Sequence, residues 1–236
     1  MEVDIEELVY VLRMATKRLL NELGKSPYAI RGKHYVLWYR GDALPCLVAH
    51  VDHVYSEDEG WDRRPIFYDG ECIWSPFGVA GDDRCGVYAC MRLFYELEVN
   101  VLFTDLEERG GVGAIEACSC NELLQTPYFV EIDRRNMREA VFYNGEEVLI
   151  PEFVDVVSRY FTITQGIFSD VTILGRHFKV AAVNVSAGFY NEHQCSAEYI
   201  HVPSLRYTME KVPQLVSELG GRRYMLPELS LYCYSC

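Results

Sequence analysis

The chain has 236 residues, of which 50% are hydrophobic and 24% are charged. Its 35 acidic and 22 basic side chains give a formal net charge of -13, and so acidic a protein repels the phosphates of nucleic acids and of anionic lipids. The apolar runs are much shorter than the ~20 residues that cross a bilayer. We therefore expect neither nucleic acid nor a membrane as a partner.

Two further features of the sequence favour a cytoplasmic protein. The N-terminal stretch MEVDIEE is acidic where a signal peptide would be basic. The nine cysteines are odd in number and irregularly spaced, and the single C-x-x-C pair, Cys233 and Cys236, lacks the second ligand pair of a zinc site. These cysteines are expected to be reduced thiols rather than a disulfide framework.

Hydrophobic periodicity and turn residues predict the elements along the chain. Apolar positions spaced by three and four residues predict helices, and short apolar runs bounded by turn residues predict strands. In chain order we expect a helix over 4–23, strands over 34–39 and 46–49, a hairpin within 66–74, a helix over 84–98, a strand over 100–104, a helix over 111–124, strands over 128–132 and 140–143, a helix over 152–161, a strand over 179–185 and a helix over 204–219.

Strands that alternate with helices in this way are typical of βαβ units. We therefore expect an α/β fold in which a mainly parallel sheet is sandwiched between helices, in three layers. No repeat, low-complexity tract or linker divides the sequence, so residues 1–236 are expected to form a single domain. In such a sheet, ligands bind at the carboxyl ends of the strands.

The predicted strand ends carry histidines and carboxylates. His50-Val51-Asp52 follows one strand, and Asp105-Leu106-Glu107-Glu108 and Asp133 follow two others. Gly81-Asp82-Asp83 lies at the turn before a predicted helix, and His193 follows the last strand. Carboxylates packed this closely would repel one another without a cation, and imidazole together with carboxylate suits zinc, manganese or cobalt.

These blocks resemble, in order, the motifs of the co-catalytic di-zinc metallopeptidase clan, which holds zinc aminopeptidases and carboxypeptidases. The resemblance implies a phosphorylase/hydrolase-like core with two divalent metal ions, zinc first and cobalt or manganese as alternatives, that hydrolyses a peptide or amide bond. The short interval between Asp133 and His193 resembles the single-domain form without a lid or dimerisation domain. The matching blocks are His50-x-Asp52, Gly81-Asp82-Asp83-x-x-Gly86, Thr104-x-x-Glu107-Glu108-x-Gly110, Asp133 and His193.

The resemblance also implies a role for each residue, and physical arguments agree with it. Alternate side chains of an extended chain share a face, so Asp52 can hold the second ring nitrogen of His50. Two divalent cations are balanced by three carboxylate ligands and one hydroxide, which suits a buried site. The implied assignment is His50 and Asp133 on one metal, Glu108 and His193 on the other, Asp82 bridging both, Asp52 orienting His50, and Glu107 as the general base beside a metal-bridging hydroxide.

Several neighbouring residues allow a second interpretation. His53 is another candidate ligand near His50. It lies three residues further on, so in an extended chain its side chain would point to the opposite face. Asp83 could form the bridge in place of Asp82, although we expect it to shape the turn. We expect Asp105 to be a strand-end or cap residue and Glu198 to lie at the surface. The pair Ser169-Asp170 is expected either to lie beside a substrate pocket or to form a helix N-cap.

Within this clan, the acidic composition favours an aminopeptidase, whose substrate would be a peptide or an amino-acid amide with a free amine. An N-acyl amino acid deacylase or a carboxypeptidase is the alternative, because Arg134 or Arg135 could bind a substrate carboxylate. A local donor such as Tyr190 or Arg134 could stabilise the developing oxyanion. A catalytically inactive relative that only binds is the alternative from another class, and the complete set of ligand residues disfavours it.

Overall fold

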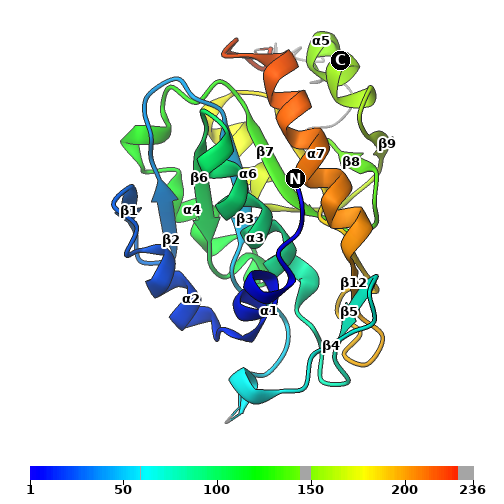
Figure 1. Cartoon of the computed structure of the whole chain (residues 1–236). Coiled ribbons are helices and arrows are strands. Elements are labelled where there is room, and N and C mark those ends of the chain that lie inside the picture. The colour runs from blue at the N-terminus through cyan, green and yellow to red at the C-terminus, as the bar shows by residue number, and fades with distance from the viewer. Residues whose placement is uncertain (59, 144–149, 228–236) are drawn as a thin grey trace, which may run out of the picture.

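The structure is a computed structural model that describes residues 1–58, 60–143 and 150–227. Its centre is an eight-stranded sheet in the order β1-β2-β6-β3-β7-β10-β8-β9 (Figure 1). The central strands β6, β3, β7 and β10 run parallel, whereas β1, β2 and β8 pair antiparallel with a neighbour. The strands are β1 (Ala29–Arg31), β2 (Tyr35–Trp38), β3 (Cys46–His50), β6 (Asn100–Thr104), β7 (Phe129–Arg134), β8 (Glu139–Val141), β9 (Thr162–Thr164) and β10 (Ala182–Ser186).

Helices cover both faces of this sheet. Side chains of β3 alternate between the faces: Leu47 and Ala49 pack into the larger apolar cluster, and Cys46 and Val48 pack into the smaller one. The expected α/β fold, a sheet between two helical layers, is confirmed (Figure 1). The larger cluster includes α1 (Ile5–Arg13), α2 (Thr16–Leu23), α3 (Gly81–Glu96), α5 (Pro151–Ser158) and α7 (Val202–Leu219), and the smaller one includes α4 (Val112–Ala117) and α6 (Asp170–Phe178).

A second, smaller sheet has the order β11-β12-β5-β4. Strands β4 (Phe67–Tyr68) and β5 (Cys72–Trp74) form the hairpin predicted within 66–74, and Asp69 stabilises its turn by accepting the backbone N–H groups of residues 71 and 72. Strands β11 (Phe189–Tyr190) and β12 (Tyr199–His201) come from much later in the chain. This sheet therefore places the loop that joins β11 and β12 beside the start of α3.

The single helix predicted over 4–23 is wrong, because the chain forms two helices there. Met14 and Ala15 are extended between α1 and α2. The Met14 carbonyl accepts a hydrogen bond from the Trp61 indole N–H at 3.3 Å, and Arg64 donates to the Leu12 carbonyl at 2.8 Å. These tertiary contacts satisfy carbonyl groups that a continuous helix would have bonded internally.

Other differences concern short elements. The helix predicted over 111–124 ends at Ala117 and is followed by a 3-10 turn over Asn121–Leu123. The edge strands β1 and β9 and the helix α6 were not predicted, because β1 and β9 have three residues each and α6 has only nine. Strand β7 continues to Arg134, so Asp133 lies within the strand rather than after it.

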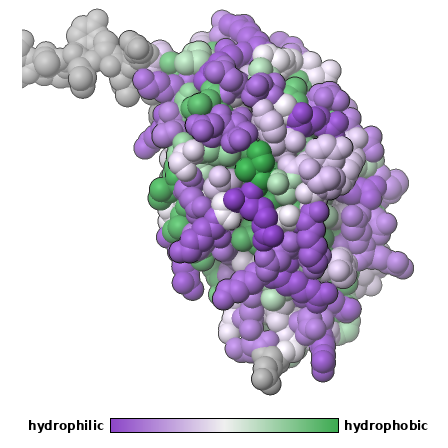
Figure 2. Space-filling view, turned by 90° about the vertical axis from the view of Figure 1, so that its left-hand side faces the viewer, coloured by the Kyte–Doolittle hydropathy of each residue, from purple (hydrophilic) through white to green (hydrophobic). Residues whose placement is uncertain are grey.

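The surface in Figure 2 is covered mostly by hydrophilic residues, with small separate apolar areas. Within residues 1–58, 60–143 and 150–227, no helix combines the length and the apolar character that crossing a bilayer requires. The cysteines in these ranges are free thiols, in agreement with the expectation. The pair Cys233 and Cys236 lies outside the described residues.

Candidate metal centre

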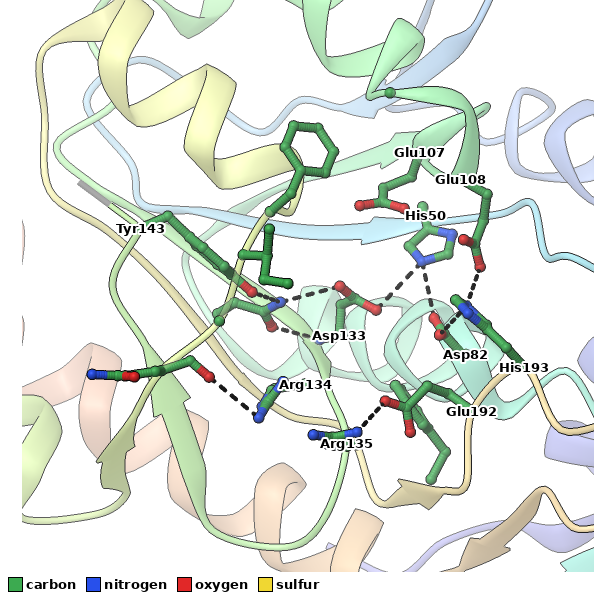
Figure 3. A pocket seen from close by; sticks show the side chains of 17 residues that line it. His50, Asp82, Glu107, Glu108, Asp133, Arg134, Arg135, Tyr143, Glu192 and His193 are labelled. Carbon is green, nitrogen blue, oxygen red and sulfur yellow. Dashed lines mark hydrogen bonds and ion pairs between the residues drawn. The ribbon is translucent and has the colours of Figure 1, made fainter. Parts of the chain in front are cut away.

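A cleft with a volume of about 570 Å³ opens at the carboxyl ends of the central parallel strands. The five predicted metal ligands and Glu107 line it, and Figure 3 shows their side chains converging on one place. They come from separate elements: His50 ends β3, Asp82 lies at the start of α3, Glu107 and Glu108 lie in a 3-10 turn after β6, Asp133 lies near the end of β7, and His193 lies between β11 and β12.

The converging side chains form two groups that share Asp82. In the first, Nε2 of His50 lies 3.1 Å from Oδ1 of Asp82 and 3.3 Å from Oδ1 of Asp133. In the second, Nε2 of His193 lies 3.2 Å from Oδ2 of Asp82 and 2.9 Å from Oε1 of Glu108. Within each group the donor atoms lie within 4.8 Å of one another. Asp82 thus turns a different oxygen to each group.

The donor chemistry of both groups fits a divalent metal ion. Each offers one imidazole nitrogen and two carboxylates, a set that suits zinc, cobalt or manganese. A cation at either group would reduce the repulsion among carboxylates that now lie close together. The described residues therefore form two candidate metal-binding groups with a common carboxylate.

The pKa values at the two histidines show how strongly the groups favour positive charge. Although burial opposes protonation, hydrogen bonds with Asp133, Asp52 and Asp82 raise the pKa of His50 well above its usual value. Hydrogen bonds with Asp82 and Glu108 raise the pKa of His193 to about 10. The same contacts hold the pKa of Asp82 below its usual value in spite of its burial. A proton on each ring supplies charge that a metal ion could supply instead.

The carboxyl groups of Asp133 and Glu107 show the opposite effect, because burial outweighs the attraction of His50 for each of them. Burial raises the pKa of Asp133 to about 7, and the negative charge of Asp82 adds to the shift. Burial also raises the pKa of Glu107 to about 9, although the positive charge of His50 opposes the shift. A divalent cation beside these carboxylates would lower both pKa values, so that Glu107 could accept a proton from a reacting group near neutral pH.

The start of α3, which is not helical at Asp82 and Asp83, directs Asp82 into the cleft and Asp83 away from it. The peptide bond between the two is cis, and Asp83 is fully buried, where it accepts hydrogen bonds from the backbone N–H groups of His50 and Gly86. A side chain at Gly86 would overlap the carbonyl oxygen of Ile132 in β7. The structure thus places Asp82, and not Asp83, between the two histidines.

Asp52 lies behind His50 and holds the turn that carries the two glutamates. Its Oδ1 is 3.4 Å from Nδ1 of His50, and the Asp52 carbonyl oxygen is closer to that nitrogen, at 3.1 Å. Its two carboxylate oxygens accept hydrogen bonds from the backbone N–H groups of Glu107 and Glu108, at 3.0 and 3.2 Å. Sequence reasoning anticipated the first contact, and it missed the second, since nothing local in the sequence indicates it.

The sequence analysis did not predict the residues that form the wall of the cleft beside Asp133. Asn184 of β10 accepts the Asp133 backbone N–H at 3.0 Å and donates to the Asp133 carboxylate at 3.1 Å. A polar residue inside the apolar strand AVNVS is a signal that could have found it. Tyr143 and the segment Gln165–Phe168 complete this wall, and the Ile167 side chain in it is 99% exposed.

Both candidate substrate arginines line the cleft, and each is paired with a glutamate. Nε of Arg134 lies 2.8 Å from Oε2 of Glu139, and Nη1 of Arg135 lies 2.7 Å from Oε1 of Glu192. The alternative oxyanion donor, Tyr190, does not line this cleft, and its hydroxyl lies 3.0 Å from Oγ of Ser204.

The residues with two interpretations lie as follows. His53 stacks on Trp61 and contacts Glu57, away from both groups. Asp105 accepts the backbone N–H of the next residue at 3.0 Å, as a strand-end residue would. Ser169 is the N-cap residue of α6, which confirms the cap interpretation of that pair. The expectation that Glu198 is exposed is wrong, because its side chain is buried and accepts hydrogen bonds from the turn before α3.

No protein-family model and no protein of curated function matches this sequence. Among solved structures, the chain is similar to aminopeptidase PepT from Bacillus cereus ATCC 10987, with a TM-score of 0.70 and 13% identity over 91% of this chain and 97% of that one. A tripeptidase from Staphylococcus aureus subsp. aureus Mu50 has a TM-score of 0.66 and 13% identity, over 90% and 96% of the two chains.

Aminopeptidase APDkam598 from the archaeon Desulfurococcus kamchatkensis is similar as well, with a TM-score of 0.63 and 14% identity over 90% of this chain and 94% of that one. At identities this low, the likeness shows a shared fold. The chain therefore has the α/β fold of these peptidase structures.

Proposed function

We propose that this chain is a di-metal-dependent hydrolase of peptide bonds, that it is an aminopeptidase, and that it acts as a single catalytic domain. The observation that carries the proposal is the position of Asp82, whose two oxygens lie 3.1 and 3.2 Å from the imidazoles of His50 and His193. A carboxylate placed between two donor groups can bind a metal ion in each of them through its separate oxygens.

In this proposal His50 and Asp133 hold one ion, Glu108 and His193 hold the other, and Asp82 binds both. Two bound divalent ions would lower the pKa of a shared water and neutralise charge that develops on the scissile carbonyl. Zinc is the first candidate, and cobalt or manganese are alternatives with the same donor preference.

Glu107 is the proposed general base. It lines the cleft beside the donor groups without forming an ion pair within the described residues. It would accept a proton from the attacking water and deliver it to the leaving amine. Asp52 would keep Glu107 in place through its hydrogen bond to the Glu107 backbone N–H.

The charge of the cleft supports an aminopeptidase. The positive charges of Arg134 and Arg135 are both compensated, by Glu139 and Glu192. A substrate carboxylate would therefore have to displace a glutamate from one of the arginines, whereas a free amine of the substrate would not.

The alternative is an N-acyl amino acid deacylase or a carboxypeptidase. One observation favours it, because both arginines do line the cleft and the Arg135 side chain is 47% exposed. An arginine that exchanged its glutamate for a substrate carboxylate would form a bidentate pair of similar strength.

A substrate panel separates these functions. Leucine amides and short peptides with a free amine, their N-acetylated forms, and N-acetyl-leucine would be assayed with added zinc, cobalt or manganese. We expect acetylation of the amine to remove most of the activity, and Arg134→Ala and Arg135→Ala to change kcat/KM only modestly. Preference for acetylated substrates, with a loss of about 10-fold or more on either arginine substitution, would identify a deacylase. Metal binding without hydrolysis of any substrate would identify a binding protein.

A further inference from the structure

Glu198 lies outside the proposed ligand set, and its carboxylate accepts four hydrogen bonds. It directly precedes β12, and its residue is only 1% exposed. Its Oε2 accepts hydrogen bonds from the Tyr55 hydroxyl at 2.7 Å and from the backbone N–H groups of Val79 and Ala80 at 3.2 and 3.0 Å. Its Oε1 accepts the backbone N–H of Asp82 at 3.2 Å.

Three of these donors belong to one short turn. The turn leads from Val79 to Asp82 and begins α3. Ala80 has a φ of 58°, in the left-handed region that a residue with a Cβ adopts only at a cost. Val79 and Ala80 are buried, so their N–H groups would be left without partners if the carboxylate were absent. Glu198 therefore holds the backbone of this turn in the conformation that it has.

Glu198 also ties this turn to the loop that carries His193. The backbone N–H groups of Ala197 and Glu198 both donate to the Gln194 carbonyl at 2.8 Å, which fixes Glu198 relative to the segment next to His193. Two residues of this one loop, His193 and Glu198, therefore act on Asp82. His193 supplies a donor atom from it, and Glu198 fixes the backbone of Asp82 from it.

We propose that Glu198 is a positioning residue that holds Asp82 between the two donor groups and thereby sets the affinity of both for divalent metal ions. The inference rests on the proposed function, because Asp82 must bind metal for its position to matter. Glu198 itself does not contact the histidines. Its effect passes through the Asp82 backbone N–H, and it should reach both groups because Asp82 belongs to both.

The substitution that tests this is Glu198→Gln. The glutamine has the same length but only one acceptor oxygen. If that oxygen bonds the N–H groups of Val79 and Ala80, its NH₂ group faces the N–H of Asp82, and two donors oppose each other. The variant should therefore release Asp82 while keeping the volume of the side chain.

The measurement is calorimetric titration of the metal-free protein with zinc chloride, repeated with cobalt chloride. We expect Glu198→Gln to weaken binding of both ions by about 10–100-fold, the usual effect of losing a residue that orients a metal ligand. Asp133→Asn, by contrast, should weaken mainly one of the two. The visible absorption of the cobalt-loaded protein should change in Glu198→Gln, because the geometry of the shared ligand changes.

Asp69→Asn is the matched control. Asp69 also accepts two backbone N–H groups, at 3.0 and 2.7 Å, but in the hairpin of β4 and β5. This substitution should lower the melting temperature and leave the metal affinities unchanged. If Glu198→Gln does not fold without metal, judged by circular dichroism, Glu198→Asp replaces it, because it retains the charge while withdrawing the carboxylate from Asp82.

The outcomes separate the two proposals. If the unmodified protein binds no metal, the proposed function fails. If it binds two ions and a folded Glu198→Gln or Glu198→Asp binds them with unchanged affinity, the positioning role of Glu198 is refuted while the metal centre stands. A loss of affinity confined to one ion would also refute it, because the shared ligand predicts an effect on both.

Discussion

Replacing Glu107 and Glu108 one at a time by glutamine should separate proton transfer from metal binding. Oε1 of Glu108 lies 2.9 Å from Nε2 of His193, whereas Glu107 forms no ion pair in the part of the chain that the structure describes. Glu107→Gln keeps the shape of the side chain and removes the proton acceptor. We expect kcat to fall by about 10²–10⁴-fold, which is about 2.7–5.4 kcal/mol of activation free energy. Glu108→Gln removes a charged donor, so metal content itself should fall.

The assay combines metal analysis of the purified variants with steady-state kinetics and thermal melting. Since burial raises the pKa of Glu107 to about 9, the neutral glutamine suits its surroundings, and Glu107→Gln should not destabilise the metal-free protein. Lost activity with a full metal complement and an unchanged fold would then mean loss of the base. Metal loss in Glu107→Gln together with full metal in Glu108→Gln would show that the two roles are reversed.

Three further substitutions or treatments have defined outcomes. Removing metal with a chelator should abolish hydrolysis. For each site loaded at a hundred times its Kd, it should also lower the free energy of unfolding by about 2.7 kcal/mol, which is about 5–10 °C in melting temperature. An unchanged melting temperature would contradict the clustering of the donors. Asp52→Asn leaves only one acceptor for the N–H groups of Glu107 and Glu108, so kcat and metal affinity should fall by about 10–100-fold, measured by kinetics and calorimetry. Gly86→Ala places a methyl group against the Ile132 carbonyl and should cost about 1–3 kcal/mol or more in urea denaturation.

The fold was predictable where a strand or helix is long and its pattern is regular. Strand β6 occupies the same residues, Asn100–Thr104, as the apolar run that predicted it. The break between α1 and α2 was not predictable, because it depends on contacts with Trp61 and Arg64 from a distant loop. The edge strand β9 has three residues, of which two are exposed, and so carries little hydrophobic signal.

The candidate site was predictable because parallel strands end at one edge of the sheet. That rule alone brings His50 and Asp133 to one place, and the structure finds them 3.3 Å apart. The rule does not predict that a carboxylate on a loop accepts a hydrogen bond from a distant backbone N–H group. Glu198 was therefore expected at the surface. The wall formed by Tyr143 and Ile167 was missed for the same reason, since it depends on how a connecting segment folds over the cleft.

The two donor groups should differ in affinity, because they differ in burial and support. His50 is the last residue of a central strand and its side chain is 1% exposed, whereas the His193 side chain lies on a loop and is 48% exposed. A donor already fixed in place loses less conformational entropy on binding a metal ion than a mobile one does. Zinc should therefore bind first at the group of His50 and Asp133. A stepwise calorimetric titration should resolve a tighter and a weaker site, and His193→Ala should retain the tighter one. Equal affinities, or loss of both sites in His193→Ala, would refute this order of binding.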